Sequence, residues 1–346
     1  MSLKSRGRLL IGPSISVIGA LLVGALLMWV SGHHPLAAYR ALFASSLSGG
    51  GLAATLGRSI PIIGLGLATG LAFRSGLFNL GGEGQFVLGG MAAALVCLFI
   101  PPLPGVLLTV IALAVAAATA GAWAWLAADW ESRLGVPVLI STLLMNYPAR
   151  LTASFLVSGP LRDVGSGLPQ TDLIPAAAHL PALGSGRVHL GLPLVVGTAF
   201  ALFWIFRRTV VGYRMRMAGL NSRFASYGGI EVDKLGRRVM FASGALAGAI
   251  GAVQVLGVHF RFIDGALTEP LYAWTGLMVA LLARSRPLTI LATGFFFAAI
   301  QTGGFGMERA VEVPRELSQV IQALIILFVA VGARRSIRDL EAGEAL

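Results

Sequence analysis

Two uncharged apolar runs on either side of one basic segment constrain this chain more than any other feature. Runs 190–206 and 239–258 contain no charged residue. Each is close to the roughly 20 residues that an α-helix needs to cross about 30 Å of hydrocarbon. Segment 207–238 between them holds eight basic side chains and two acidic ones. Because short loops rich in Lys and Arg stay on the cytoplasmic side of a membrane, we expect this segment to be a cytoplasmic loop that orients its neighbours.

The composition agrees with a membrane protein. Of the 346 residues, 56% are hydrophobic and only 12% are charged, about half the charged share of a typical soluble domain. A net charge of +11 can indicate nucleic-acid binding. Here the basic residues fall mostly in short loops between apolar runs, so we assign them to topology and to the anionic leaflet surface. We expect a lipid bilayer as partner and no nucleic acid.

The apolar runs predict an all-α polytopic membrane protein, with residues 1–346 as one transmembrane domain. The ten expected spans lie near residues 9–30, 59–73, 76–100, 105–128, 136–157, 190–206, 239–258, 270–283, 287–303 and 317–333. With this number both termini are cytoplasmic, and most Lys and Arg fall on the side of segment 207–238. The first run is too long for a signal peptide and has no A-x-A site, so we expect it to be retained. The polar segment 158–189 is expected to be an external loop.

Two expected spans, 59–73 and 270–283, are short for a bilayer. Short or broken segments often line the substrate path of a transporter, because irregular backbone is tolerated at depth only where it faces protein or water. The alternative is that both are ordinary spans extended by small residues.

Polar side chains near the start of the expected span 76–100 are the sharpest intramembrane feature. Asn79, Glu83 and Gln85 lie there among glycines. An acid within a span costs a few kcal/mol and needs a partner or an aqueous cavity. These residues, with Asn146 in the run 136–157, are therefore candidates for the translocation path or for holding together the helices that form it. A purely structural hydrogen-bond cluster is the alternative.

Glycine spacing and absent motifs add two expectations. Gly66 with Gly70, and Gly244 with Gly248, have the GxxxG spacing that allows close helix packing. The sequence contains no G-x-x-x-x-G-K-[ST], H-E-x-x-H or G-x-S-x-G motif, so the chain is not by itself a P-loop ATPase and shows no zinc-protease or serine-hydrolase signature. Its five histidines lack metal-ligand spacing, and its one cysteine, Cys97, excludes an intramolecular disulfide. We expect no catalytic residue, no metal and no cofactor bound by this chain.

Inside the basic segment, residues 218–230 read AGLNSRFASYGGI. Asn221 can cap a helix, and Phe224 and Tyr227 are three residues apart, which favours a short amphipathic helix along the membrane face. Such a helix can dock a cytosolic partner, or it can lie at the interface without one.

Several stretches, in this order, resemble the permease subunits of ATP-binding-cassette importers for branched-chain amino acids, simple sugars and nucleosides. The likeness is greatest to the nucleoside and simple-sugar branch. It rests on GLFNLGGEGQFVLGG (76–90), STLLMNYPARL (141–151), AGLNSRFASYGGI (218–230), FASGALAGAIGAVQVLG (241–257), GLMVALLARSRPL (276–288) and VPRELSQVIQALIILFVA (313–330). Two positions depart from that branch. Residues 135–137 are Gly-Val-Pro where an Asn-Glu pair is frequent, and Pro148 follows Asn146 and Tyr147.

The resemblance implies a permease that forms the path for nucleosides or simple sugars in a bacterial inner membrane. Its implied partners are a cytosolic ATPase dimer that uses ATP and Mg²⁺, a second permease subunit and an extracytoplasmic solute-binding protein. Segment 218–230 would be the coupling helix that contacts the ATPases. The coupling residues implied are Gly219, Asn221, Phe224, Ala225, Tyr227, Gly228 and Ile230.

Two other functional classes remain open at this point. A secondary transporter driven by an ion gradient would use Glu83 as a proton or cation carrier and would need no ATPase. A membrane-embedded enzyme would need paired acids or a histidine cluster, and the sequence shows neither pattern.

Overall fold

The computed structural model describes residues 18–19, 21–100, 103–184, 188–312, 314, 319–320, 323–324 and 327. Regular structure in these ranges is helical, apart from isolated bridges of Gln170 with Ile263 and of Ala182 with His189. Six helices of the described residues are long and apolar enough to cross a membrane. The expected polytopic helical membrane protein is therefore confirmed.

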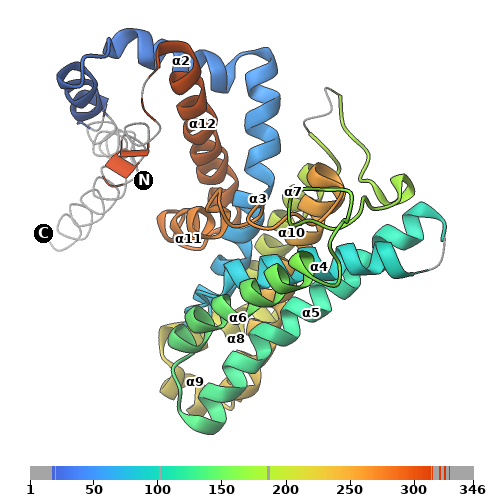
Figure 1. Ribbon diagram of the computed structural model, residues 1–346. Coiled ribbons are helices and arrows are strands. Elements are labelled where there is room, and N and C mark those ends of the chain that lie inside the picture. Colours follow the sequence, from blue (N-terminus) through green and yellow to red (C-terminus); the bar gives the residue numbers. More distant parts are fainter. Residues whose placement is uncertain are drawn as a thin grey trace, which may run out of the picture. The chain divides into compact units, whose positions relative to one another are not determined.

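The helices run through the whole described chain (Figure 1). Leu21–Val30 is helical and precedes the labelled elements. These are α2 (Pro35–Leu47), α3 (Gly49–Phe73), α4 (Gly82–Phe99), α5 (Gly105–Leu134), α6 (Val138–Ser158), the 3-10 turn η1 (Ala176–Ala178), α7 (Gly191–Arg208), α8 (Val210–Leu220), α9 (Ser222–Tyr227), α10 (Val232–Gln254), the π-helical turn η2 (Val255–His259), α11 (Tyr272–Leu282) and α12 (Pro287–Val311).

The chain divides into two compact units, residues 1–55 with 298–346, and residues 56–297. In the first unit, α2 packs against the end of α12. A Cβ atom at Gly303 would lie 2.6 Å from Cγ of Leu42, so glycine lets these two helices approach closely.

The core of the second unit forms where α4, α5 and α10 pack side by side (Figure 1). Small residues fill the crossing. A Cβ at Gly248 would lie 2.4 Å from that of Ala120 on α5, and one at Gly89 on α4 would lie 2.2 Å from the Gly248 Cα. Such distances leave no room for a larger side chain. The packing role predicted for the second GxxxG pair is confirmed.

The first GxxxG pair also lies in a helix contact of the second unit. Cβ atoms at Gly66 and Gly70 would lie 3.2 and 3.0 Å from the side chain of Ile290 on α12. Gly276 on α11 approaches Gly66 so closely that its Cβ would lie 2.8 Å from the Gly66 nitrogen. The packing prediction is confirmed for this pair too.

Two expected spans begin at other residues than predicted. α3 starts at Gly49 rather than at residue 59, so this 25-residue helix is not short; its small residues before Arg58 continue the helix instead of ending it. α4 starts at Gly82 rather than at residue 76. The intervening residues turn, because Gly76 adopts φ +79° and Asn79 Oδ1 accepts a hydrogen bond from the Gly81 nitrogen at 2.9 Å.

Segment 207–238, the basic segment between two expected spans, is mostly helical. It contains the end of α7, all of α8 and α9 and the first turns of α10. Side-chain caps explain the two breaks: Thr209 Oγ1 accepts from the Gly212 nitrogen at 3.1 Å, and Asn221 Oδ1 from the Phe224 nitrogen at 3.0 Å. α10 begins at Val232, seven residues before the expected start at 239.

The other expected spans differ from the helices mainly at their ends. Helix α5 continues to Leu134 and stops at Gly135, which has φ +70°. Pro148 lies inside α6 without ending it, and α12 continues to Val311. The predicted short span 270–283 is the 11-residue α11, about 16 Å long and so shorter than the hydrocarbon layer. Residues 9–17 and 20 of the expected span 9–30, and most of the expected span 317–333, lie outside the described ranges.

Candidate translocation and coupling sites

Asn79 and Gln85 form a reciprocal amide pair. Asn79 Nδ2 donates to Gln85 Oε1 at 2.9 Å, and Gln85 Nε2 donates to Asn79 Oδ1 at 3.0 Å. Asn79 Nδ2 also donates to Ser243 Oγ of α10 at 2.9 Å, and Ser243 Oγ donates to the Ala68 carbonyl of α3 at 2.7 Å. All three polar side chains are buried. The pair therefore joins α3, α4 and α10 through satisfied hydrogen bonds, as a polar group at membrane depth requires.

Asn146 joins α6 to the start of α4. Its Oδ1 accepts from the Gly84 nitrogen at 2.8 Å, and its Nδ2 donates to the Leu80 carbonyl at 2.9 Å. One turn earlier, Thr142 Oγ1 accepts from the Leu80 nitrogen at 3.1 Å. The first N–H groups of a helix have no partner within it, so α6 supplies here the cap that the sequence before α4 does not. We call Asn79, Gln85, Thr142, Asn146 and Ser243 the amide cluster.

Glu83 lies in the first turn of α4, where the positive end of the helix dipole favours a carboxylate. Its Oε1 accepts from Arg150 Nη1 of α6 at 3.1 Å, and its Oε2 accepts from Trp274 Nε1 of α11 at 2.8 Å. The Glu83 side chain is only 10% exposed, whereas that of Arg150 is 51% exposed. The Glu83 carboxylate thus has two hydrogen-bond partners, and one of them, Arg150, is also partly exposed to solvent.

Sequence reasoning grouped Asn79, Glu83, Gln85 and Asn146, and the structure brings all four to the start of α4. It did not find Arg150, Trp274 or Ser243 as partners. A usable signal existed for Arg150, because a lone base in an apolar run requires an acid nearby. Ser243 and Trp274 carried no such signal, since their residue types are common within spans.

The six-residue α9 presents aromatic side chains outward. Phe224 is 63% exposed and Tyr227 is 91% exposed, while Ala225 between them is buried. After the helix the chain turns at Gly229, which has φ +79°, and the Ile230 nitrogen donates to the Ala225 carbonyl at 3.0 Å. The short helix predicted within 218–230 is confirmed for Ser222–Tyr227.

Gly219 at the end of α8 contacts the turn between α3 and α4. A Cβ at Gly219 would lie 2.5 Å from the Arg74 carbonyl oxygen, and one at Gly76 would lie 3.2 Å from the Gly219 Cα. Three residues after Gly76 comes Asn79. One tight backbone contact therefore connects the end of α8 to the turn that carries Asn79, one member of the amide cluster.

Basic side chains gather at this contact. The Arg74 guanidinium lies 5.1 Å from the ring centre of Phe206, within the range of a cation–π interaction. Burial lowers the pKa of Arg74 from its usual value, and the neighbouring charges of Arg216 and Arg286 lower it further. Close to α9, Lys234 pairs with Glu231 and lowers the pKa of that carboxyl.

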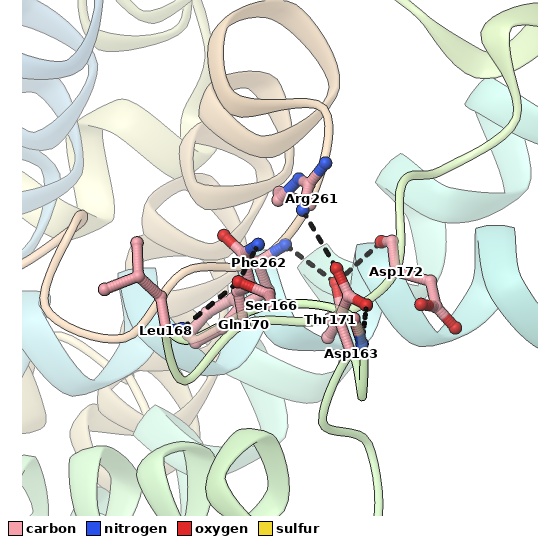
Figure 2. Close-up of polar contacts among 9 residues, drawn as sticks. Asp163, Ser166, Leu168, Gln170, Thr171, Asp172, Arg261 and Phe262 are labelled. Atoms are coloured by element: carbon pink, nitrogen blue, oxygen red, sulfur yellow. Dashed lines mark hydrogen bonds and ion pairs between the residues drawn. The ribbon is translucent and has the colours of Figure 1, made fainter.

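Beyond α10 and η2, residues 163–174 of the polar segment 158–189 pair with residues 260–264 (Figure 2). The Thr171 nitrogen donates to the Phe262 carbonyl at 2.9 Å, and the Phe262 nitrogen donates to Thr171 Oγ1 at 3.0 Å. Arg261 Nη1 lies 3.3 Å from Asp163 Oδ2. The segment is thus held by backbone pairing and an ion pair, and it fixes the chain that leads from η2 to α11.

An open cleft lies beside this docked segment. It has about 740 Å³ of space not filled by protein atoms, its mouth included, and it is walled by one face of α6, by Val87 of α4 and by residues 262–269. Among the described residues, no group of three His, Cys, Asp or Glu side chains is placed to hold a metal ion.

Fold and site together define the class of this chain: a polytopic helical membrane protein whose buried polar side chains join its helices. The family model described as branched-chain amino acid transport system / permease component matches residues 51–330. The chain belongs to this family, whose members are transport components rather than enzymes.

Curated relatives locate the chain within the family. The glucose ABC transporter permease protein of Haloferax volcanii is 32% identical over 92% of this chain and 86% of its own length. The guanosine ABC transporter permease protein of Bacillus subtilis is 32% identical over 93% of both chains. The nucleoside ABC transporter permease protein of Lactococcus lactis is 27% identical over 95% of this chain and 93% of its own. These matches confirm the predicted simple-sugar and nucleoside branch of ABC permeases.

Proposed function

We propose that this chain is the permease subunit of an ATP-binding-cassette importer that moves nucleosides or simple sugars through a bacterial cytoplasmic membrane. The names of its relatives support this range of substrates, since they specify glucose, nucleosides and guanosine. Nucleosides are the first choice, because two of these three names specify them.

One observation carries the proposal: the exposed aromatic surface of α9 is connected by the Gly219–Gly76 contact to the amide cluster. An importer needs such a connection, because ATP is hydrolysed on one subunit and the path opens in another. In this proposal Gly219, Asn221, Phe224, Ala225, Tyr227, Gly228 and Ile230 form the coupling surface for a cytosolic ATPase dimer. The chain itself binds no cofactor, and the ATPases bind ATP and Mg²⁺.

The proposal includes the predicted ten spans, with both termini and the α8–α9 region in the cytoplasm. The basic residues of segment 207–238 support this orientation. The polar segment 158–189 then faces outward, toward an extracytoplasmic solute-binding protein. A second permease subunit, most simply a homologue, completes the path.

Glu83, Asn79, Gln85 and Asn146 have two roles in this scheme. Glu83 borders the path, because its partner Arg150 is open on one side. Asn79, Gln85 and Asn146 set the positions of the helices around it, because their polar atoms are directed toward neighbouring backbone and side chains. The ion pair of Glu83 with Arg150 also speaks against Glu83 as a free proton carrier in a gradient-driven transporter.

The test is uptake of radiolabelled guanosine into proteoliposomes that contain this chain and its co-purifying subunits. Guanosine and the binding protein are supplied on one side and ATP on the side that bears the ATPases, with excess ribose as competitor. ATP-dependent uptake that ribose leaves unchanged supports a nucleoside importer, and suppression by ribose assigns the system to sugars. Uptake by the chain without any ATPase would overturn the importer in favour of a secondary transporter.

A further inference from the structure

The cleft beside α6 has a polar wall with a helical repeat. Tyr147, Arg150, Leu151 and Ser154 all line it, and their spacing of three and four residues places them on one face of α6. Tyr147 is 62% exposed and Leu151 is 68% exposed. Exposing the polar side chains of Arg150, Tyr147 and Ser154 to lipid would cost free energy. We therefore expect this face of α6 to contact water or a ligand.

The opposite wall contributes two carboxylates. Asp264 Oδ2 accepts from Ser154 Oγ at 2.7 Å, which leaves its other oxygen for a further donor. Glu269 is exposed, and its carboxylate lies against Gly265 on the tight turn that follows η2. Among the described residues no side chain forms an ion pair with it. Asp264 is held in place by Ser154 and by its own backbone nitrogen, which donates to the Pro169 carbonyl at 3.0 Å.

Donors and acceptors thus face each other across the cleft. The positive charge of Arg150 is largely balanced by Glu83 at its back, and its remaining N–H groups, with the Tyr147 hydroxyl, are donors. Asp264 and Glu269 are acceptors. A cationic ligand in the cleft would be repelled by the Arg150 guanidinium, and an anionic ligand would be repelled by the carboxylates of Asp264 and Glu269. A neutral molecule with several hydroxyl groups satisfies both walls, since each hydroxyl both donates and accepts.

We propose that this cleft is the permease's own substrate site and that it binds the polyhydroxylated part of the substrate, the ribose of a nucleoside or the ring of a sugar. Asp264 and Glu269 accept hydrogen bonds from vicinal hydroxyls, Arg150 donates to a ring or hydroxyl oxygen, and the exposed Tyr147 ring packs on the apolar face. The inference rests on the proposed function for the class of substrate.

Cysteine protection tests the site without requiring transport. Leu151→Cys places a thiol in the cleft and keeps every polar group, while Cys97 is buried and gives little background labelling. Leu173→Cys is the matched control, because Leu173 is 59% exposed and lies outside the lining. The assembled transporter is labelled with a membrane-impermeant maleimide in the presence of guanosine, ribose, glucose or 2′,3′-dideoxyguanosine.

We expect at least one hydroxylated probe to protect residue 151 but not residue 173, and dideoxyguanosine to protect it poorly. Adding Glu269→Gln should raise the concentration for half protection about tenfold, because it replaces a charged acceptor by a neutral one. The same change at exposed Asp172, Asp172→Asn, should leave that concentration unchanged.

The outcomes separate this inference from the proposed function. ATP-driven uptake by the unmodified protein without any protection at residue 151 overturns the substrate site and leaves the importer. A thiol at 151 that the maleimide does not reach in the assembled transporter also overturns it, in favour of a subunit interface. Protection without ATP-driven uptake supports the site and overturns the importer, and the absence of both overturns both.

Discussion

Glu83 Oε1 lies 3.1 Å from Arg150 Nη1, although 67 positions separate the two residues in the chain. The acid is nearly buried and the base is half exposed, so the two partners depend on the pair to different degrees. Removing the base leaves a buried carboxylate with Trp274 as its remaining donor, whereas removing the acid leaves a base that water can reach.

This asymmetry predicts that Arg150→Met destabilises the protein more than Glu83→Gln does. An unpaired buried charge costs about 1 to 3 kcal/mol, and the half-exposed Arg150 solvates its own charge. The double variant should recover most of the loss caused by Arg150→Met. Thermal unfolding of the four proteins in detergent measures this cycle, and equal losses from the two single variants would contradict it.

Gly248→Val should destabilise the second unit. The added Cβ would lie 2.4 Å from that of Ala120 and 2.5 Å from the Ala116 carbonyl, and overpacking of this kind costs about 1 to 3 kcal/mol. Gly197→Val is the control, because a Cβ at Gly197 meets no atom within 4 Å. The measurement is the amount of monodisperse protein recovered after heating, and similar losses from the two variants would contradict the packing argument.

Replacing Phe224 and Tyr227 together by Asp should abolish ATP-driven uptake without preventing membrane insertion. Both side chains are exposed on α9, so the change removes apolar docking surface rather than core. Phe224→Leu with Tyr227→Phe keeps that surface apolar and should retain uptake. Normal uptake by the Asp variant would remove the docking role of α9.

Gly219→Val should uncouple ATP hydrolysis from transport. The added Cβ would lie 2.5 Å from the Arg74 carbonyl oxygen and would push the α8–α9 junction away from the turn before Asn79. We expect uptake to fall at least tenfold while the ATPase subunits still co-purify and hydrolyse ATP. Gly229→Asn, at a left-handed position with nothing within 4 Å, should leave uptake near normal, since Asn tolerates this conformation. Uptake by Gly219→Val at the rate of the unmodified protein would show that the contact between Gly219 and the turn before Asn79 is not needed to couple ATP hydrolysis to transport.

His189 should make the protein less stable at acid pH. Burial lowers its pKa below the usual value near 6.5, and Nδ1 accepts from the Gly191 nitrogen at 3.1 Å in the neutral form. As the pH falls below about 6.5, the unfolded chain gains a proton that the folded site resists, so unfolding becomes easier. His189→Gln should flatten the drop in unfolding temperature between pH 7.5 and 5.5, and His34→Gln, at an exposed position, should not. An unchanged slope in His189→Gln would contradict the argument.

Hydrophobic runs were sufficient to predict the helical class and the approximate positions of most described helices. Helix ends were less predictable, because they depend on local hydrogen bonds. The sequence around Asn79 looks like the interior of an apolar run, yet Asn79 closes a turn on Gly81 and α4 starts only at Gly82. Arg58 looked like the boundary of a span, but α3 passes through it.

Four residues of the candidate site, Asn79, Glu83, Gln85 and Asn146, were grouped from the sequence, but their connections were not predicted. Glu83 within a span had to have a partner, yet the sequence analysis did not single out Arg150. Which nitrogen meets which oxygen depends on how α6 crosses α4, and no periodicity in either helix contains that information. The Gly219 contact was unpredictable for the same reason, since a glycine at a helix end is usually explained by the cap alone.

The length of α9 has a consequence for how this surface behaves. Six residues are far fewer than the about 12 to 15 that an isolated helix needs in water. The isolated segment would therefore not form a stable helix. In the protein its helical structure depends on the Asn221 cap and on the burial of Ala225. A change that broke the Asn221 cap or exposed Ala225 would therefore be expected to lower the fraction of molecules in which these six residues are helical.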